Sequence, residues 1–119
     1  MRATLYGIPN CDQVKKARAW LSVGGHDVEF HDFKKSGIDR ATIESWLSEV
    51  SWETLLNRRG TTWRALPDER KACVVDADTA IDLMLDMPSL IKRPVLTLPS
   101  QIIVGFSDAN YQSAFQKIP

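Results

Sequence analysis

The sequence predicts an α/β protein with a mixed β-sheet, flanking helices and a helical insertion between a βαβ half and a ββα half. Two observations carry this prediction. Short β-prone runs lie towards both ends of the 119-residue chain, and a strongly periodic helical segment joins the first two of them. The middle of the chain, about residues 38–91, has helical periodicity only. No repeat or linker divides the chain, so we expect one domain over residues 1–119.

The N-terminal part of the chain predicts a βαβ unit. Ala3–Tyr6 is β-prone, and the breakers Gly7 and Pro9 follow it. A helix comes next, because apolar residues recur at helical spacing while basic residues fall on the other face. Asp27–Asp32 alternates like a strand, and a helix of this length joins parallel strands. The inward-facing helix positions are Val14, Ala17 and Leu21.

The central segment predicts several helices. Asp39 is a plausible N-cap for a helix whose apolar period continues to Val50. The pattern is less regular around residue 60, where Gly60 and the pair Thr61-Thr62 are expected to break a helix. A further helix begins at Asp76 or Asp78, each of which is a suitable capping residue.

The C-terminal part predicts a ββα unit. Val95–Leu98 and Ile102–Val104 are strand-like, and the three residues between them have the spacing of a hairpin. A final helix follows, with its apolar face formed by Tyr111, Ala114, Phe115 and Ile118. A βαβ unit and a ββα unit that share one mixed sheet form the thioredoxin arrangement, in which the central helices are an insertion.

Charge and hydropathy argue against several classes of protein. The chain has 15 Lys and Arg and 15 Asp and Glu, and without a basic surplus we expect no dedicated nucleic-acid binding. No apolar stretch is long enough to span a membrane, and Met1 leads into a β-prone run instead of a signal peptide, so we expect a cytoplasmic protein. His26 and His31 lack acidic or cysteine companions at ligand spacing, so no metal is expected.

Cys11 is the candidate nucleophile. It is expected at the corner between a strand and the first turn of the following helix, where free backbone N–H groups and the positive end of the helix dipole favour a thiolate. Nearby cations also lower a cysteine pKa, and Lys15, Arg58 and Arg59 are candidates for this role. The alternative interpretation is that Cys11 is a small buried hydrophobic residue, as free cysteines often are.

The sequence contains no C-x-x-C pair. Val14 occupies the position of the second cysteine in a dithiol helix, so release of a mixed disulfide requires an external thiol such as glutathione. Cys73 lies among apolar residues, and we expect it to be packed or idle rather than a resolving cysteine. Pro94 directly precedes a predicted strand, where a proline is tolerated. One interpretation of Lys92 and Arg93 is that they are solvated charges at the end of a helix.

Three segments together resemble the ArsC/Spx family of thioredoxin-like proteins, and most closely its YffB-like branch. They are Y-G-I-P-N-C-D-Q-V-K-K-A-R-A-W-L, L-L-N-R-R-G-T-T-W-R and I-K-R-P-V-L. The resemblance spans essentially the whole chain and implies a thioredoxin fold with a helical insertion. It also implies an active cysteine at Cys11, a cis-proline at Pro94, and an Arg93 side chain that faces the thiol.

In arsenate reductases of this family, the thiol attacks the oxyanion, three arginines hold it, and glutathione with glutaredoxin completes the cycle. Arg93 matches one of these arginines. The arginine of the insertion falls at Asn57 or at its neighbours Arg58 and Arg59. The third arginine has no counterpart, since Phe106 lies near its place.

Three functional hypotheses follow. The first is a glutathione-dependent thiol reductase, in which Cys11 is the nucleophile and Arg93 with Arg58 or Arg59 stabilises the thiolate or anchors glutathione carboxylates. Glutathione is then a co-substrate, glutaredoxin is a candidate partner, and no tightly bound cofactor is expected. The alternative is a non-catalytic module that binds RNA polymerase, as Spx regulators do, although Spx proteins typically carry a second cysteine at the position of Val14. The third is arsenate reduction.

Overall fold

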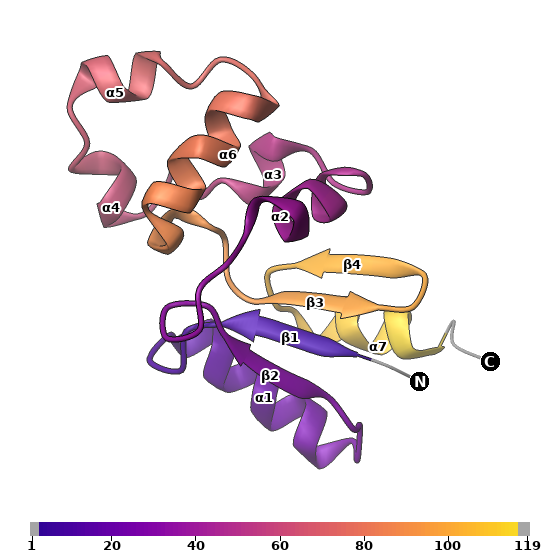
Figure 1. The fold of residues 1–119 in the computed structure, drawn as a ribbon. Coiled ribbons are helices and arrows are strands. Elements are labelled where there is room, and N and C mark those ends of the chain that lie inside the picture. Colours follow the sequence, from indigo (N-terminus) through magenta and orange to yellow (C-terminus); the bar gives the residue numbers. More distant parts are fainter. Residues whose placement is uncertain (1–2, 117–119) are drawn as a thin grey trace. The chain divides into compact units, whose positions relative to one another are not determined.

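The computed structural model describes residues 3–116 of the chain, which form two compact units (Figure 1). The first unit comprises the chain up to Ser36 and from Arg93 onward, and the second is Gly37–Lys92. The second unit occupies the region in which the sequence predicts the insertion. The assignment of the chain as a single domain stays a prediction.

The first unit contains a four-stranded mixed sheet in the order β2-β1-β3-β4. The strands are β1 (Thr4–Gly7), β2 (Glu29–Asp32), β3 (Val95–Leu98) and β4 (Gln101–Val104). The central strand β1 is parallel to β2 and antiparallel to β3, and β3 is antiparallel to β4. The predicted α/β fold with a mixed sheet is therefore confirmed. The hairpin is tighter than expected, because Gln101 pairs with Leu98 and leaves only Pro99 and Ser100 in the turn.

Helices α1 (Asp12–Val23) and α7 (Asp108–Gln116) lie on the same side of this sheet (Figure 1). Their apolar faces and the sheet form one core, as the helical spacing predicts. Its buried members are Ala3, Leu5, Ala17, Leu21, Leu96, Leu98, Tyr111 and Ala114. Full burial of a leucine stabilises a fold by roughly 1.5–3 kcal/mol, so these contacts hold both helices to the sheet. Phe115 packs at the edge of the core, while Ile118 lies outside the described residues.

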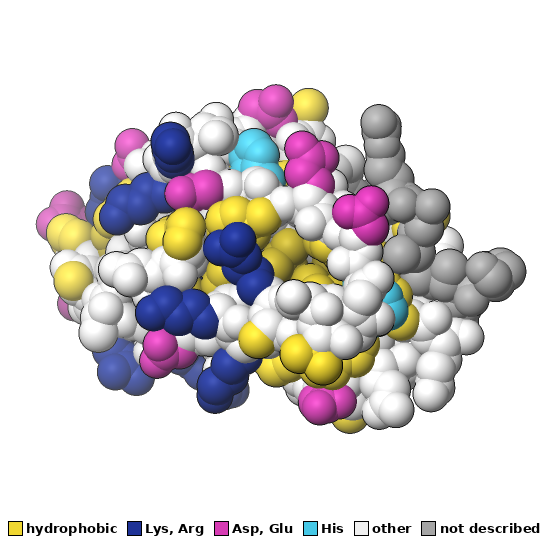
Figure 2. Space-filling model, turned by 90° about the horizontal axis from the view of Figure 1, so that it is seen from below, with side chains coloured by type: hydrophobic (Ala, Val, Ile, Leu, Met, Phe, Trp, Pro, Cys, Tyr) yellow, Lys and Arg dark blue, Asp and Glu magenta, His cyan; other side chains and the backbone are white. Residues whose placement is uncertain are grey.

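Figure 2 shows basic, acidic and hydrophobic side chains together on one face of the molecule. Beside α1, a hollow of about 570 Å³ is lined by residues that include Lys16, Trp20, Val23 and Phe106. Within the described chain, no helix is long and apolar enough to cross a membrane.

The second unit is helical. Its elements are α2 (Arg40–Leu47), α3 (Trp52–Leu55), α4 (Thr61–Arg64), α5 (Asp68–Ala72), α6 (Ala77–Asp86) and the 3₁₀ turn η1 (Pro88–Leu90). Asp39 caps α2 as predicted, since its carboxylate accepts a hydrogen bond of 2.8 Å from the Thr42 N–H. Of the two candidates for the start of α6, Asp76 is the cap, and it forms a reciprocal capping box with Thr79.

Two predictions for the second unit are wrong in detail. The helix that begins after Asp39 ends at Leu47 and does not continue to Val50, whose N–H donates to the Trp46 carbonyl in the turn that follows. Thr61 and Thr62 do not break a helix but form the first turn of α4, and Gly60, which lies between α3 and α4, is its N-cap.

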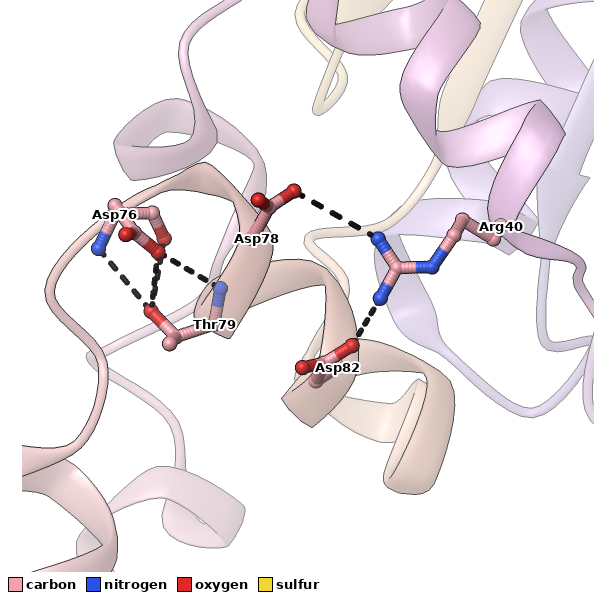
Figure 3. A network of polar contacts seen from close by, with 5 residues as sticks. All are labelled: Arg40, Asp76, Asp78, Thr79 and Asp82. Carbon is pink, nitrogen blue, oxygen red and sulfur yellow. Dashed lines mark hydrogen bonds and ion pairs between the residues drawn. The ribbon is translucent and has the colours of Figure 1, made fainter.

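A polar network joins α2 to α6 (Figure 3). The Arg40 guanidinium pairs with the Asp82 carboxylate and lies 3.8 Å from that of Asp78. Asp76 and Thr79 at the start of α6 complete the capping box in the same view. The ion pairs are exposed, so each contributes only about 0–1 kcal/mol, and the buried faces of the helices hold the unit together.

Candidate functional site

Cys11 lies at the junction between β1 and α1. It is the N-cap residue of α1, with extended backbone angles of φ −94° and ψ 130°. Its N–H donates a 3.1 Å hydrogen bond to the Ile8 carbonyl, which closes the turn between strand and helix. The side chain is half-buried. The predicted place of this cysteine at a strand-to-helix corner is thus confirmed, although Cys11 caps the helix and its first turn begins at Asp12.

A close contact between Gly7 and Val14 fixes how the helix leaves the strand. Both residues are buried, and Val14 is fully inaccessible to solvent. A Cβ atom at position 7 would lie only 2.7 Å from Cγ2 and 3.2 Å from Cγ1 of Val14. A glycine therefore allows the first turn of α1 to pack directly against the end of β1 beside Cys11.

The surroundings of Cys11 favour its thiolate. Partial burial raises the pKa of the thiol, but the Val14 N–H, a hydrogen bond from the Arg93 side chain, the Gln13 N–H and the charge of Arg93 all lower it. The net pKa lies below the ordinary value of a cysteine. Both N–H groups belong to the first turn of α1, where the positive end of the helix dipole also favours a thiolate. The thiolate fraction at neutral pH is raised accordingly.

Strand register explains why Arg93 meets Cys11, although the two residues are far apart in the sequence. Tyr6 in β1 pairs with Val95 in the antiparallel strand β3. The chain leaving β1 towards Cys11 therefore runs beside the chain that enters β3 through Arg93 and Pro94. The Arg93–Pro94 peptide bond is cis, Pro94 is buried, and its carbonyl accepts a 2.8 Å hydrogen bond from the Gly105 N–H.

The other predicted site residues belong to α1 and to the second unit. Lys15 is exposed on α1, and its N–H donates a 2.9 Å hydrogen bond to the Cys11 carbonyl. It is not among the causes of the lowered Cys11 pKa. Arg58 and Arg59 belong to the second unit and are exposed there. The roles assigned to these residues stay predictions.

Cys73 was expected to be packed or idle, and the first alternative is wrong because its side chain is exposed. It is the exposed C-cap of the five-residue helix α5, which buries none of its side chains. Because this short helix has no buried face, the Cys73 thiol is not packed into a core, although its neighbours in the sequence are apolar. Cys73 instead lines an open cavity of about 330 Å³ beside α6.

The histidines contact aromatic rings. The His26 ring stacks on Phe115 and Trp20, with centroid distances of 3.9 and 5.4 Å, and His31 lies 5.1 Å from Tyr6. Among residues 3–116, no three His, Cys, Asp or Glu side chains are grouped so that they could hold a metal ion.

Phe106, which the family resemblance puts near the place of a third arginine, has a packing role. Its ring meets the buried Tyr111 ring edge-on, with centroids 4.8 Å apart. Gly105 before it has φ +86°, a conformation that glycine adopts without strain, and this turns the chain from β4 towards α7.

The sequence profile of the ArsC family matches residues 6–114, which is most of the chain. The chain belongs to the ArsC family. A solved structure of the YFFB protein is 48% identical to this ArsC-family chain, with a TM-score of 0.90 and coverage of 94% of this chain and 97% of that one. An arsenate reductase related protein from Brucella melitensis is 50% identical, with a TM-score of 0.75 and coverage of 99% and 97%.

The global transcriptional regulator Spx of Streptococcus pyogenes is a more distant relative. It is 31% identical over 108 residues, which cover 88% of this chain and 78% of Spx. These matches confirm the ArsC/Spx family, its YffB-like branch and the thioredoxin-like fold that the sequence predicts. At the level of the family they support a thiol oxidoreductase.

Proposed function

We propose that this ArsC-family protein is a glutathione-dependent thiol oxidoreductase with Cys11 as its nucleophile. The observation that carries the proposal is the pairing of Cys11 with Arg93, which lowers the pKa of the thiol together with the amides at the start of α1. A thiolate is the attacking species in thiol–disulfide exchange, so a lowered pKa supplies more of it at neutral pH.

The reaction proceeds through a mixed disulfide. The Cys11 thiolate attacks one sulfur of a substrate disulfide, forms a new S–S bond and expels the other sulfur as a thiolate. A glutathione thiolate then attacks the substrate sulfur of this mixed disulfide and releases Cys11 as a thiolate. A second glutathione reduces the resulting glutathione–substrate disulfide. One substrate disulfide is reduced to two thiols, and two glutathione molecules are oxidised to one glutathione disulfide.

The roles of the remaining residues follow from their charge. Arg93 holds the Cys11 thiolate when it leaves the mixed disulfide. Arg58 or Arg59 anchors a carboxylate of glutathione, because a guanidinium matches the two oxygens of a carboxylate. Glutaredoxin is a candidate partner for the last step, in which the glutathione–substrate disulfide is reduced. Val14 leaves no local cysteine to resolve the mixed disulfide, so an external thiol is required.

A matched pair of cysteine variants tests the proposal. Cys11→Ser should abolish glutathione-dependent reduction of a model disulfide such as hydroxyethyl disulfide, coupled to glutathione reductase. Cys73→Ser, which changes the exposed cysteine of the second unit, should retain the activity of the native chain. Activity retained in Cys11→Ser would refute the role of Cys11 as nucleophile.

The match to Spx favours a second candidate, a regulator that binds RNA polymerase and does not turn over thiols. Recovery of polymerase subunits with the tagged protein, in both the native form and Cys11→Ser, would support this candidate. Failure to recover them would argue against it.

The Brucella melitensis relative, described as arsenate reductase related, keeps arsenate reduction as a third candidate. Phe106 at the position expected for a third arginine argues against it. Oxidation of glutathione that depends on arsenate would support arsenate reduction.

A further inference from the structure

The hollow of about 570 Å³ in the first unit lies between α1 and the segment that joins β4 to α7. Helix α1 lines it with four residues at the spacing i, i+3, i+4 and i+7, which places them on one face: Lys16, Ala19, Trp20 and Val23. This face is not the one that packs on the sheet. The Val23 side chain is 91% exposed. We call this feature the α1 hollow.

The two aromatic walls of the α1 hollow rest on one buried side chain. The rings of Trp20 and Phe106 both meet the Tyr111 ring edge-on, with centroids 5.5 and 4.8 Å away. Tyr111 is fully buried in the core of the first unit. Edge-on ring pairs have a preferred geometry, so the core holds both walls in place. A hollow that is formed before binding loses little conformational freedom when it is filled.

Both walls of the α1 hollow belong to chain segments that meet at the proposed nucleophile. Helix α1 follows directly on its N-cap, Cys11. On the other wall, Gly105 precedes Phe106 and donates its N–H to the Pro94 carbonyl at 2.8 Å. The residue before Pro94 is Arg93, whose side chain donates a hydrogen bond to the Cys11 thiol. A molecule that reacts at the thiol can therefore extend along α1 into the hollow within one unit.

Charge indicates which kind of occupant suits the α1 hollow. Lys16 is exposed and takes part in no ion pair with another described residue. Asp108, the acid of the lining, lies in the first turn of α7, where the positive end of the helix dipole offsets its charge. The hollow thus favours an acidic group beside Lys16 and an apolar group beside Trp20 and Val23. Glutathione has no large apolar side chain, whereas a polypeptide segment can supply both groups.

We propose that the α1 hollow binds the polypeptide segment next to the reacting cysteine of a protein disulfide, so that proteins are the preferred substrate class of Cys11. This inference rests on the proposed function. A helix rises about 1.5 Å per residue, so Lys16 and Trp20 lie about 7 and 13 Å along α1 from Cys11. An extended segment spans these distances with about two and four residues, whose side chains share one face. We therefore expect an acidic residue two positions and an apolar residue four positions from the substrate cysteine.

Peptides whose cysteine forms a disulfide with 2-mercaptoethanol test this inference. The Cys11 thiolate attacks the peptide sulfur and expels 2-mercaptoethanol as a thiolate. Two glutathione molecules then release the peptide thiol and form one glutathione disulfide. The sequences Cys-Ser-Glu-Ser-Leu and Leu-Ser-Glu-Ser-Cys cover both chain directions. In one of them, leucine should raise kcat/KM about three- to tenfold over the same peptide with serine in its place, because leucine buries apolar surface in the hollow.

Variants on the exposed face of α1 show whether the preference arises in the hollow. Val23→Ser should abolish the preference for leucine, and Lys16→Gln should abolish a preference for glutamate over glutamine in the peptide. Val75→Ser is the matched control, because Val75 is a 70% exposed valine of the second unit and lies outside the lining. Hydroxyethyl disulfide carries no segment that could fill the hollow, so all three variants should reduce it at the native rate.

Each outcome decides the inference. A preference for leucine that Val23→Ser abolishes and Val75→Ser keeps supports it. Equal kcat/KM for the leucine and serine peptides, or a preference that Val23→Ser leaves unchanged, overturns it, while continued reduction of hydroxyethyl disulfide upholds the proposed function. A dimer in sedimentation velocity that Val23→Ser dissociates would assign the hollow to a second copy of the chain and overturn it as well. If the native protein reduces neither hydroxyethyl disulfide nor the peptides, the proposed function fails and this inference fails with it.

Discussion

Replacing Gly7 by alanine places a methyl group where β1 meets the first turn of α1. The new Cβ would lie 2.7 and 3.2 Å from the two methyl carbons of Val14, which is fully buried. Overpacking of this kind costs about 1–3 kcal/mol. The strain acts on the turn that presents the Val14 N–H to Cys11, so we expect Gly7→Ala to reduce both the free energy of unfolding and the reactivity of Cys11.

A double-mutant cycle gives the size of this effect. Val14→Ala removes two buried methyl groups and leaves a cavity, so it should cost about 2 kcal/mol. If Gly7→Ala alone also costs about 2 kcal/mol and the two substitutions act independently, the double variant should lose about 4 kcal/mol of the free energy of unfolding. In the double variant the clash is absent and the new methyl fills part of the cavity. We expect a total near ~2 kcal/mol, and hence an interaction of about 2 kcal/mol.

Urea unfolding of the native protein, the two single variants and the double variant gives the free energies of this cycle. The rate of Cys11 alkylation at neutral pH reports whether the start of α1 is displaced. Gly7→Ala should slow alkylation, and the double variant should recover part of the rate. Additive free energies, with an interaction below about 0.5 kcal/mol, would refute the role of the Gly7–Val14 contact.

Three further predictions concern single side chains. Tyr111→Phe should raise the free energy of unfolding by about 1 kcal/mol, because the buried hydroxyl has no hydrogen-bond partner among the described residues; a loss of stability in urea would contradict this. The Thr79 N–H and hydroxyl lower the pKa of Asp76, so Asp76→Ala should destabilise the protein at neutral pH. The loss in the free energy of unfolding should become smaller as the pH falls through that pKa, and a loss that does not change with pH would contradict this prediction. Arg93→Gln should raise the pKa of Cys11 and slow its alkylation at pH 7, and an unchanged pH profile would exclude the contact.

The parts of the fold that follow local patterns could be predicted from the sequence. The spacing of Val14, Ala17 and Leu21 indicates the buried face of α1, and all three are buried. The end of α2 was not predictable from its apolar period, because Val50 keeps the spacing after the helix has ended at Leu47. The two-residue hairpin turn also escaped prediction, since the pairing of Gln101 with Leu98 depends on the register of two strands.

In the candidate site, too, the local sequence predicts one residue and not its partner. The position of Cys11 at the start of a helix follows from local sequence, whereas its partner Arg93 was indicated only by the family resemblance. No local pattern places Arg93 beside Cys11, because strand register does so across more than eighty residues of chain. The exposure of Cys73 was missed because apolar sequence neighbours do not define packing around a helix that buries nothing.

The pH dependence of Cys11 alkylation by iodoacetamide, followed by mass spectrometry in a Cys73→Ser background, tests the activated thiol most directly. A parallel incubation with oxidised glutathione reports on mixed-disulfide formation. We predict an alkylation midpoint below that of a free cysteine, about 8.5, and a glutathione adduct on Cys11. A midpoint at or above about 8.5 without an adduct would contradict a nucleophilic role for this cysteine.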